Sequence, residues 1–345
     1  MKNNSQTALI VGAGRIAGLN ERDPTRRKPC THLGALASQK SISIAGIVDA
    51  DIDRAKEFAR TFSIEHAGGS LSEALKQLRP DIVTVAVPYW HQYDVAMELV
   101  RHPHRPRKVL LEKPLAKNLA EAEVIIREFS RAGIAVLVNN ECAAPVFAQI
   151  QKLLADEFGG QIISASAWCS SGMRAVGIHL LGILRFLFGP IAWVRAVSEV
   201  EHVESLPFST NYVSDDPRIH GMLMFESGVS GFLTNSALTQ FTYKEIEVTC
   251  RSGKVRLSDN GDLLQVWRLA RPGKSTLSYR LQPPENIPVA PATAFSKIGE
   301  FLASDDQRAG ADILGGEVAL EVYRTLDALT RSARENRDIH VREAA

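Results

Sequence analysis

The sequence has little of what would place it in a specialised class of proteins. Its 345 residues include only four cysteines, Cys30, Cys142, Cys169 and Cys250, which are far apart and lack the spacing of a zinc site. We therefore expect neither a disulfide framework nor a metal site, and we interpret the cysteines as reduced thiols in the cytoplasm. No apolar run reaches the roughly 18 residues that suggest a membrane-spanning helix. The polar start leads into a predicted strand without a signal-peptide core, so we expect a cytoplasmic protein with no membrane partner.

An excess of one charge is equally absent, since 40 Lys and Arg residues face 39 Asp and Glu residues. The formal net charge of +1 gives no reason to expect a nucleic-acid partner. With 45% hydrophobic and 23% charged residues, the chain is typical of globular proteins and long enough for two domains. Internal repeats and low-complexity tracts are also lacking. The function must therefore be sought in short motifs.

The first motif is Gly12-Ala13-Gly14-Arg15-Ile16-Ala17, which follows a predicted buried strand at 8–11. In a G-x-G-x-x-A motif the first glycine permits a tight turn, and the second lets the backbone approach a diphosphate. The third small residue lets the following helix pack closely on the strand. The unpaired N–H groups at that helix N-terminus attract phosphate. The motif predicts that Gly12, Ala13, Gly14, Arg15 and Ile16 bind a dinucleotide, although ordinary turn residues are an alternative.

An acidic residue, Asp49, ends the second predicted strand, at 42–48. A carboxylate there accepts hydrogen bonds from the adenine ribose and repels a 2′-phosphate, which favours NAD over NADP. Its distance from the glycine motif exceeds the usual separation of about 20 residues. The polar segment Asn20–Cys30, with two prolines, predicts an insertion before a helix that starts near Thr31. Arg54 is expected beside the adenosine.

The insertion carries four basic residues that could bind a phosphate group or could simply be solvated: Arg22, Arg26, Arg27 and Lys28.

Strand and helix patterns alternate through residues 7–140, which predicts a doubly wound parallel sheet of the Rossmann type. Strands are expected at 8–11, 42–48, 82–87, 108–111 and 134–138, and helices at 32–39, 51–61, 70–78, 91–101 and 118–131. Beyond a boundary near Asn139–Asn140 the pattern predicts an α+β domain with an open, mainly antiparallel sheet. Its helices are expected at 145–158, 177–188, 293–303 and 311–335, and its strands at 161–168, 192–200, 219–225, 229–237, 244–250, 254–258 and 263–268.

The segment Glu112-Lys113-Pro114 follows the buried strand at 108–111. Ligands of a doubly wound fold bind beyond the carboxyl ends of the strands, so Lys113 is expected near the nicotinamide. A cis bond before Pro114 would fix the direction of the lysine. The alternative is a solvated ion pair between Glu112 and Lys113.

Together with Val87-Pro88-Tyr89-Trp90-His91, these motifs resemble the glucose–fructose oxidoreductase / inositol dehydrogenase family, Gfo/Idh/MocA. Their order matches through residues 1–140 apart from the insertion, and the antiparallel sheet extends the resemblance over nearly the whole chain. The resemblance implies that residues 1–140 bind a nicotinamide cofactor, with Pro88, His91, Glu112 and Lys113 close to it. It implies that residues 141–345 bind a carbohydrate substrate and form a homodimer or homotetramer through the sheet.

The segment Ala175-Val176-Gly177-Ile178-His179 resembles the family's Asp-x-Gly-x-His signature. His179 matches the family histidine, whereas Ala175 replaces the acid of many members and puts an Asp-based proton relay in doubt. A histidine with an ordinary pKa of about 6.5 suits proton transfer near neutral pH, with Lys113 sharing the proton or polarising the substrate oxygen. The alternative is that His179 is only packed at a helix start. Weaker candidates are Asn140, Tyr212, Asp215, Asp216 and His220, and Cys142 stands where the family often has an arginine.

The resemblance and the motifs together predict an NAD-dependent dehydrogenase that acts on a carbinol or carbonyl carbon of a sugar, nucleotide sugar or cyclitol. One alternative is a redox-neutral glycosidase that retains NAD and forms no net NADH. Another is a sensor or regulator without catalytic activity, which the replacement at Ala175 leaves open.

Overall fold

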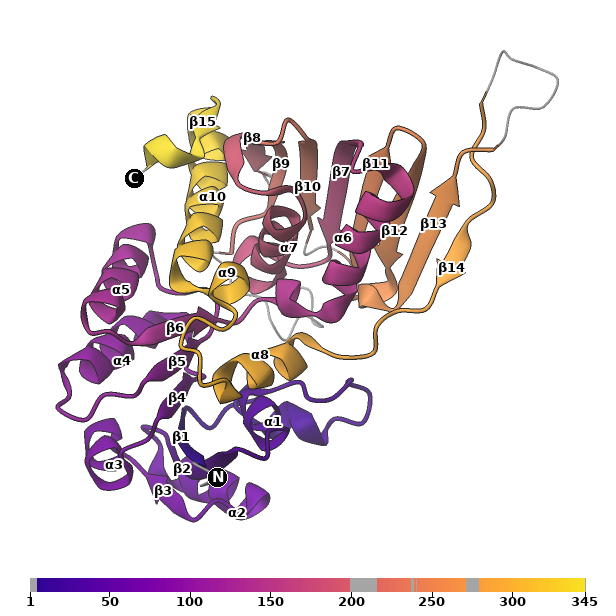
Figure 1. Ribbon diagram of the computed structural model, residues 1–345. Helices are drawn as coiled ribbons and strands as arrows, with labels where there is room; N and C mark the ends of the chain where they lie inside the picture. Colours follow the sequence, from indigo (N-terminus) through magenta and orange to yellow (C-terminus); the bar gives the residue numbers. More distant parts are fainter. Residues whose placement is uncertain (1–4, 199–215, 237–238, 240, 271–278, 345) are drawn as a thin grey trace. The chain divides into compact units, whose positions relative to one another are not determined.

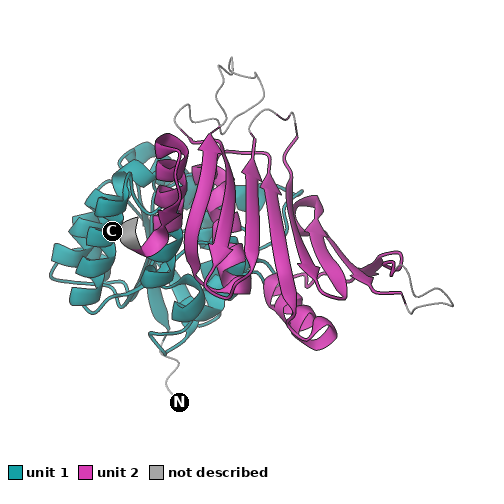
Figure 2. Ribbon diagram, turned by 90° about the horizontal axis from the view of Figure 1, so that it is seen from above, with its two compact units in different colours: residues 1–144, 292–323 teal, residues 145–291, 324–345 magenta. Residues whose placement is uncertain are grey.

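The computed structural model describes residues 5–198, 216–236, 239, 241–270 and 279–344. Its contacts divide the chain into two compact units. The first unit contains residues 1–144 and 292–323, and the second contains residues 145–291 and 324–345 (Figure 2). The predicted division into domains of residues 1–140 and 141–345 remains a prediction, and the compact units differ from it because the segment 292–323 joins the first unit.

The first unit is built on a six-stranded sheet in the order β3-β2-β1-β4-β5-β6 (Figure 1). Every neighbouring pair is parallel, which confirms the predicted Rossmann-type fold. All four residues of β4 and of β5 are buried, as expected for strands covered on both faces. The short strand β3 escaped prediction because three residues carry no recognisable period. The strands are β1 (Gln6–Val11), β2 (Ile42–Val48), β3 (His66–Gly68), β4 (Ile82–Val85), β5 (Lys108–Leu111) and β6 (Ala135–Val138).

Five helices connect these strands, and each starts within two residues of its predicted position. Side chains just before four of them, Thr31, Asp51, Ser70 and Asn118, accept hydrogen bonds from the first-turn N–H groups. Such caps satisfy donors that have no partner inside the helix, which explains why the helices begin at these residues. The helices are α1 (His32–Ala37), α2 (Ile52–Phe62), α3 (Leu71–Leu78), α4 (Tyr89–Arg101) and α5 (Leu119–Arg131).

The glycine motif is followed by a short turn and a loop rather than directly by a long helix. The chain makes one turn, with Gly18 N donating to Gly14 O at 3.4 Å, and then leaves the helical path. It returns at α1, where the N–H groups of His32 and Leu33 donate to the carbonyls of Ile16 and Ala17, at 3.1 and 2.8 Å. The predicted insertion is therefore confirmed. It separates the single turn after the glycine motif from α1, which continues the hydrogen bonding of that turn.

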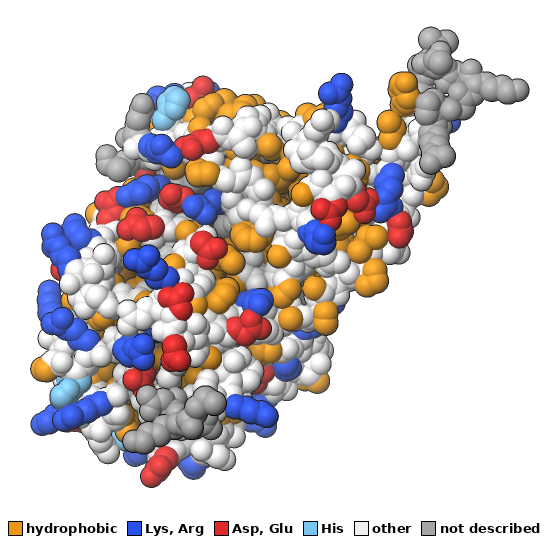
Figure 3. Space-filling model, viewed as in Figure 1, with side chains coloured by type: hydrophobic (Ala, Val, Ile, Leu, Met, Phe, Trp, Pro, Cys, Tyr) orange, Lys and Arg blue, Asp and Glu red, His pale blue; other side chains and the backbone are white. Residues whose placement is uncertain are grey.

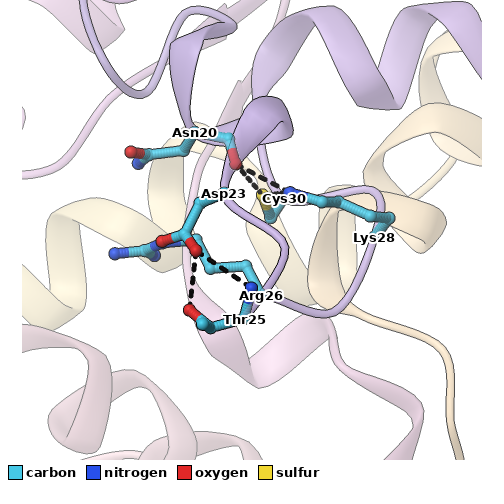
Figure 4. Close-up of polar contacts among 6 residues, drawn as sticks. All are labelled: Asn20, Asp23, Thr25, Arg26, Lys28 and Cys30. Atoms are coloured by element: carbon cyan, nitrogen blue, oxygen red, sulfur yellow. Dashed lines mark hydrogen bonds and ion pairs between the residues drawn. The ribbon is translucent and has the colours of Figure 1, made fainter.

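The inserted loop is held by its own polar contacts (Figure 4). Asp23 accepts hydrogen bonds from Thr25 Oγ1 at 2.7 Å and from Arg26 Nε at 3.3 Å. Lys28 Nζ donates to Asn20 O at 2.7 Å and lies 3.5 Å from Cys30 Sγ. Arg26 and Lys28 thus contact the loop itself.

The segment 292–323 adds α8 (Ala294–Ala303) and α9 (Ala311–Leu314) to the first unit. The buried Lys108 ties α8 to the sheet, since its Nζ donates to Phe301 O at 2.8 Å and to Leu302 O at 3.3 Å. The predicted helix at 311–335 is interrupted at Gly315, whose backbone forms an antiparallel bridge with Leu137. The chain continues as α10 (Gly316–Glu335), whose residues are shared between the units.

The second unit is built on a nine-stranded sheet in the order β14-β13-β12-β11-β7-β10-β9-β8-β15. Among the described strands of this sheet only the β10–β7 pair is parallel, which confirms a mainly antiparallel sheet. Residues 199–200 of the predicted strand at 192–200, and residue 237 of the one at 229–237, lie outside the described residues. The strands are β7 (Ile162–Cys169), β8 (Ile191–Ser198), β9 (Ile219–Phe225), β10 (Ser230–Asn235), β11 (Lys244–Cys250), β12 (Gly253–Ser258), β13 (Leu263–Arg268), β14 (Glu285–Ile287) and β15 (Ile339–His340).

One face of this sheet is covered by α6 (Pro145–Phe158), α7 (Ile178–Phe188) and part of α10 (Figure 1). Residues alternate along the strands between buried and more exposed, as in the pattern of β9. This alternation is typical of a sheet that packs on helices through one face only. In the part of the chain that is described, no helix is long and apolar enough to cross a membrane. Charges of both signs are interspersed over the face shown in Figure 3.

Candidate cofactor and active site

The predicted cofactor residues lie at the carboxyl edge of the six-stranded sheet. The order of the strands reverses between β1 and β4, and the crevice at such a reversal is where doubly wound folds bind ligands. Gly12 follows β1, Asp49 follows β2, and Lys113 lies just beyond the end of β5. The first unit therefore brings the glycine turn, the acid and the lysine to one edge.

The two glycines of the turn have different roles. Gly12 has a φ of 95°, and a Cβ there would lie 2.7 Å from the Ala86 carbonyl oxygen, so no other residue fits. A Cβ at Gly14 would meet nothing within 4 Å. The turn thus leaves open space beside the backbone at Gly14, as the approach of a diphosphate requires. The residues present therefore fit a dinucleotide.

Asp49 is only 8% exposed, and its carboxylate fixes the turn. Oδ2 accepts from Ala13 N at 2.8 Å, while Oδ1 accepts from Asp51 N at 2.9 Å and from Arg54 Nη2 at 2.6 Å. Burial raises the pKa of Asp49, but the hydrogen bonds from Arg54, Ala13 and Asp51 lower it more, so the group is a carboxylate. Arg54 lies beside this acid. The predicted positions of Asp49 and Arg54 at the adenosine remain predictions.

The segment after β4 carries the next predicted residues. Pro88 precedes α4, and its carbonyl accepts from His91 N at 2.9 Å. The ring of His91 is exposed and lies against Trp90, with the ring centroids 6.1 Å apart. The roles of Pro88 and His91 toward a cofactor remain predictions.

The buried neighbour of His91, Gln92, has a structural role that the sequence reasoning missed. It is 0% exposed, and its Nε2 donates to Glu112 O at 2.9 Å and to Pro114 O at 2.7 Å. These bonds hold the backbone on both sides of Lys113, and the predicted cis bond before Pro114 is confirmed. The signal was available, because Gln92 lies in helical phase with buried Ala96 and Leu99.

Glu112 is 6% exposed, so the alternative of a solvated Glu112–Lys113 ion pair was wrong. Oε1 of Glu112 accepts from Asn139 Nδ2 and lies at the same 2.8 Å distance from His32 Nε2. Oε2 accepts from Lys113 N at 3.3 Å. Burial raises the pKa of Glu112, but His32, Lys113 and Asn139 together lower it below its ordinary value. The described bonds of this carboxylate are to the protein, and its predicted contact with a cofactor remains a prediction.

His179 belongs to the second unit, where it lies in the first turn of α7 and is 7% exposed. A π-helical turn, Met173–Gly177, precedes it. The carboxylate of Asp216 accepts from Arg174 N at 2.7 Å and from Ala175 N at 2.9 Å. An acid from a distant part of the sequence therefore holds the backbone at the position where the family motif carries its own acid.

The weaker candidates have varied positions. Asn140 accepts from Cys142 N at 3.1 Å and caps a short turn in the first unit. His220 is half-buried on β9 of the second unit. Tyr212 and Asp215 lie outside the described residues.

The fold and the glycine turn define the class of protein to which the chain belongs, that of the oxidoreductases with a dinucleotide-binding Rossmann domain. Within that class, the chain belongs to the GFO/IDH/MocA family. Residues 7–140 match the model of the oxidoreductase family with an NAD-binding Rossmann fold, and residues 147–256 match the GFO/IDH/MocA C-terminal domain. The predicted family and its nicotinamide cofactor are confirmed.

Several characterised proteins are similar to this chain. D-apiose dehydrogenase of Paraburkholderia graminis is 25% identical over 66% of the chain and 64% of its own length. Trans-1,2-dihydrobenzene-1,2-diol dehydrogenase of Oryctolagus cuniculus is 28% identical over 52% of the chain and 56% of its own length. Each match thus spans less than two thirds of the relative. A crystal structure of an Agrobacterium radiobacter oxidoreductase with NAD+, L-tartaric acid and magnesium has a similar fold, with a TM-score of 0.75 and 17% identity over 99% of this chain and 100% of that one.

Proposed function

We propose that the protein is an NAD-dependent dehydrogenase that moves a hydride between NAD and a carbinol or carbonyl carbon of a sugar, nucleotide sugar or cyclitol. The observation that supports this most directly is Lys113, whose backbone is held at the carboxyl edge of the sheet, the edge that also carries the glycine turn, by Gln92 and Glu112. The names of the two similar dehydrogenases give D-apiose and a dihydrobenzenediol as substrates, both of which carry hydroxyl groups.

The proposed roles follow from chemistry. When bound, NAD accepts or supplies the hydride. The backbone at Gly12, Ala13, Gly14, Arg15 and Ile16 holds its diphosphate, and Asp49 accepts hydrogen bonds from its ribose. The ammonium group of Lys113 donates a hydrogen bond to the substrate oxygen. His179 takes or returns the hydroxyl proton.

We further propose that the open face of the second sheet joins subunits into a homodimer or homotetramer. Phe232 on β10 is 49% exposed and Val197 on β8 is 55% exposed. Phe232 pairs with Met222 of β9, which in turn pairs with Arg195 of β8. Large apolar side chains on an uncovered sheet face are typical of a protein interface.

A cytoplasmic location is part of the same proposal. Three of the four cysteines are buried, and burial raises the pKa of Cys250 to about 11. A protonated, buried thiol packs as a small apolar side chain, as suits a reducing compartment.

The test is a turnover screen of aldoses, nucleotide sugars, cyclitols and vicinal diols with NAD, in which NADH formation is measured. Lys113→Ala should lower turnover about 10²–10⁴-fold, the usual scale for proton-transfer groups. It should leave the Kd for NADH nearly unchanged, and Lys117→Ala serves as a matched control on the exposed surface. Bond cleavage with retained NAD and no NADH would instead indicate a redox-neutral glycosidase. Sugar binding without turnover would indicate a regulator.

A further inference from the structure

Two ionisable side chains far apart in the sequence meet inside the first unit. His32 is 0% exposed and Glu112 is 6% exposed, and their Nε2 and Oε1 atoms lie 2.8 Å apart. Burying a charged group is costly unless it is paired and hydrogen-bonded. A buried pair of this kind needs a reason, and the roles given above do not use His32.

We propose that His32 and Glu112 form a positioning pair that fixes Lys113 relative to the glycine turn. This inference rests on the proposed role of Lys113. His32 itself is too deeply buried to meet a substrate, so it acts through Glu112.

The glycine-turn side of this connection is the backbone of α1. The N–H groups of His32 and Leu33 donate to Ile16 O and Ala17 O, so His32 moves with the glycine motif. Its ring is further confined by Phe295, with the ring centroids 5.8 Å apart.

The lysine side of the connection is the carboxylate of Glu112. Oε2 accepts from Lys113 N at 3.3 Å, and Oε1 accepts from Asn139 Nδ2 at 2.8 Å. Nε2 of Gln92 also donates hydrogen bonds to the carbonyls of Glu112 and Pro114. The backbone at Lys113 is thereby held both through a carboxylate and through the neighbouring carbonyls.

The protonation of the pair follows from its surroundings. The titratable groups that face Glu112 are His32 and Lys113, both of which lower its pKa, as does the hydrogen bond from neutral Asn139. An ionised carboxylate can only accept, so His32 Nε2 must carry the proton. His32 Nδ1 has no hydrogen-bond partner among the described residues. Among the described residues, the imidazole ring of His32 is therefore hydrogen-bonded through Nε2 to Glu112 alone.

Variants separate a positioning role from a merely structural one. His32→Leu removes the donor, whereas His32→Gln can keep an N–H group at similar reach. Glu112→Gln removes the charge while keeping an acceptor. His104→Gln is the matched control, because His104 lies in the segment before β5 and its described contacts are to His102.

The first readout needs no substrate and therefore separates a failure of this inference from a failure of the proposed dehydrogenase. Lys113 is labelled with trinitrobenzenesulfonate. The rate of labelling at Lys113 is measured by peptide mass spectrometry, with the labelling rate of Lys117 as internal reference. We expect His32→Leu and Glu112→Gln to change the labelling rate of Lys113, and His32→Gln to restore most of it. An unchanged Lys113 rate in folded His32→Leu, or in Glu112→Gln should His32→Leu not fold, would overturn the inference.

The second readout is a double-mutant cycle on turnover. A displacement of a reacting group by about 1 Å can cost about 10²-fold in rate, so we expect His32→Leu to lower kcat about tenfold to a hundredfold, with NADH affinity retained. In a Lys113→Ala background the same change should have no further effect, because the group that it positions is gone. An equal loss of kcat in both backgrounds would show that His32 only supports the fold.

Discussion

The contact between Asp49 and Arg54 leads to a quantitative prediction about nicotinamide preference. The Asp49 carboxylate, which we propose binds the adenine ribose, is almost fully buried and accepts three hydrogen bonds, from Ala13 N, Asp51 N and Arg54 Nη2. The guanidinium lies on its solvent side, since the side chain of Arg54 is 56% exposed and that of Asp49 is 6% exposed. A 2′-phosphate bound there would therefore meet a buried negative charge and a solvent-exposed positive one.

The sizes of these two effects can be compared. Two unit charges 4 Å apart interact by about 4 kcal/mol at an effective dielectric constant of about 20. The contribution of Arg54 is screened by solvent, and exposed pairs contribute at most about 1 kcal/mol. After the carboxylate's own partial screening, we expect a net preference for NADH of about 1–3 kcal/mol, or about tenfold or more in affinity.

Two substitutions should move this preference in opposite directions. Asp49→Ser removes the repulsion but keeps Arg54, so NADPH should bind as well as NADH or better. Arg54→Ala removes the compensating charge, so the preference for NADH should widen by about fivefold, the equivalent of about 1 kcal/mol. Asp53→Ser is the matched control, because the side chain of Asp53 is 89% exposed and lies on α2, the helix that carries Arg54.

Fluorescence titration with NADH and with NADPH gives the ratio of their Kd values for each variant. Asp49→Ser also loses the hydrogen bond from Ala13 N, but a loss that weakens both cofactors equally does not change this ratio. If wild-type protein binds NADPH more tightly than NADH, the assignment of Asp49 is refuted. If Arg54→Ala instead weakens discrimination, the guanidinium acts on the adenosine and not on the phosphate.

Four further results are expected. His179→Ala should slow alcohol oxidation and abolish the rise of kcat with pH that proton transfer to a histidine produces near pH 6–7; an unchanged profile would show that another group is the base. Lys108→Met removes the ammonium group that caps α8 and should lower the free energy of unfolding by about 2–4 kcal/mol in a denaturant titration, whereas Lys117→Met should have no effect. Because the pKa of Glu112 is lower in the folded state, its ionised form stabilises the fold above its ordinary pKa, and this stability is lost as pH falls through the folded pKa; Glu112→Gln should flatten that acid dependence in a pH series of unfolding curves. Phe232→Asp should reduce the molar mass measured by light scattering if the open sheet face joins subunits, and an unchanged mass would rule this face out.

The features that the sequence predicted well are those that depend on neighbouring residues. The first sheet, its helix starts and the glycine turn follow from apolar runs, capping side chains and glycine positions within a few residues of one another. The antiparallel sheet was visible for the same reason, because its strands follow one another through short turns. The very short strands β3, β14 and β15 exist only because a longer neighbour offers them an edge. They could not be found from local pattern.

The features that escaped prediction depend on residues that are distant in sequence. The pairing of His32 with Glu112 spans 80 positions, and no local pattern marks either residue as the partner of the other. The acid at Asp216 holds the turn at Ala175 across 41 positions. The motif alone shows that an acid is missing at position 175. The fold places the carboxylate of Asp216, from the segment before β9, against the backbone there.

The insertion lengthens the chain between the glycine motif and Asp49 without removing the backbone hydrogen bonds of the motif. A helix needs donors for the carbonyls of Ile16 and Ala17, and His32 and Leu33 supply them after the loop. Glu21 closes the base of the loop, since its Oε1 accepts from Cys30 N at 2.6 Å and Thr31 Oγ1 at 2.8 Å. Without the looped segment, Asp49 lies about 20 residues beyond the motif, which is the usual separation. The loop thus returns the chain to the carbonyls of Ile16 and Ala17, so the hydrogen bonds at the end of the motif form despite the longer spacing.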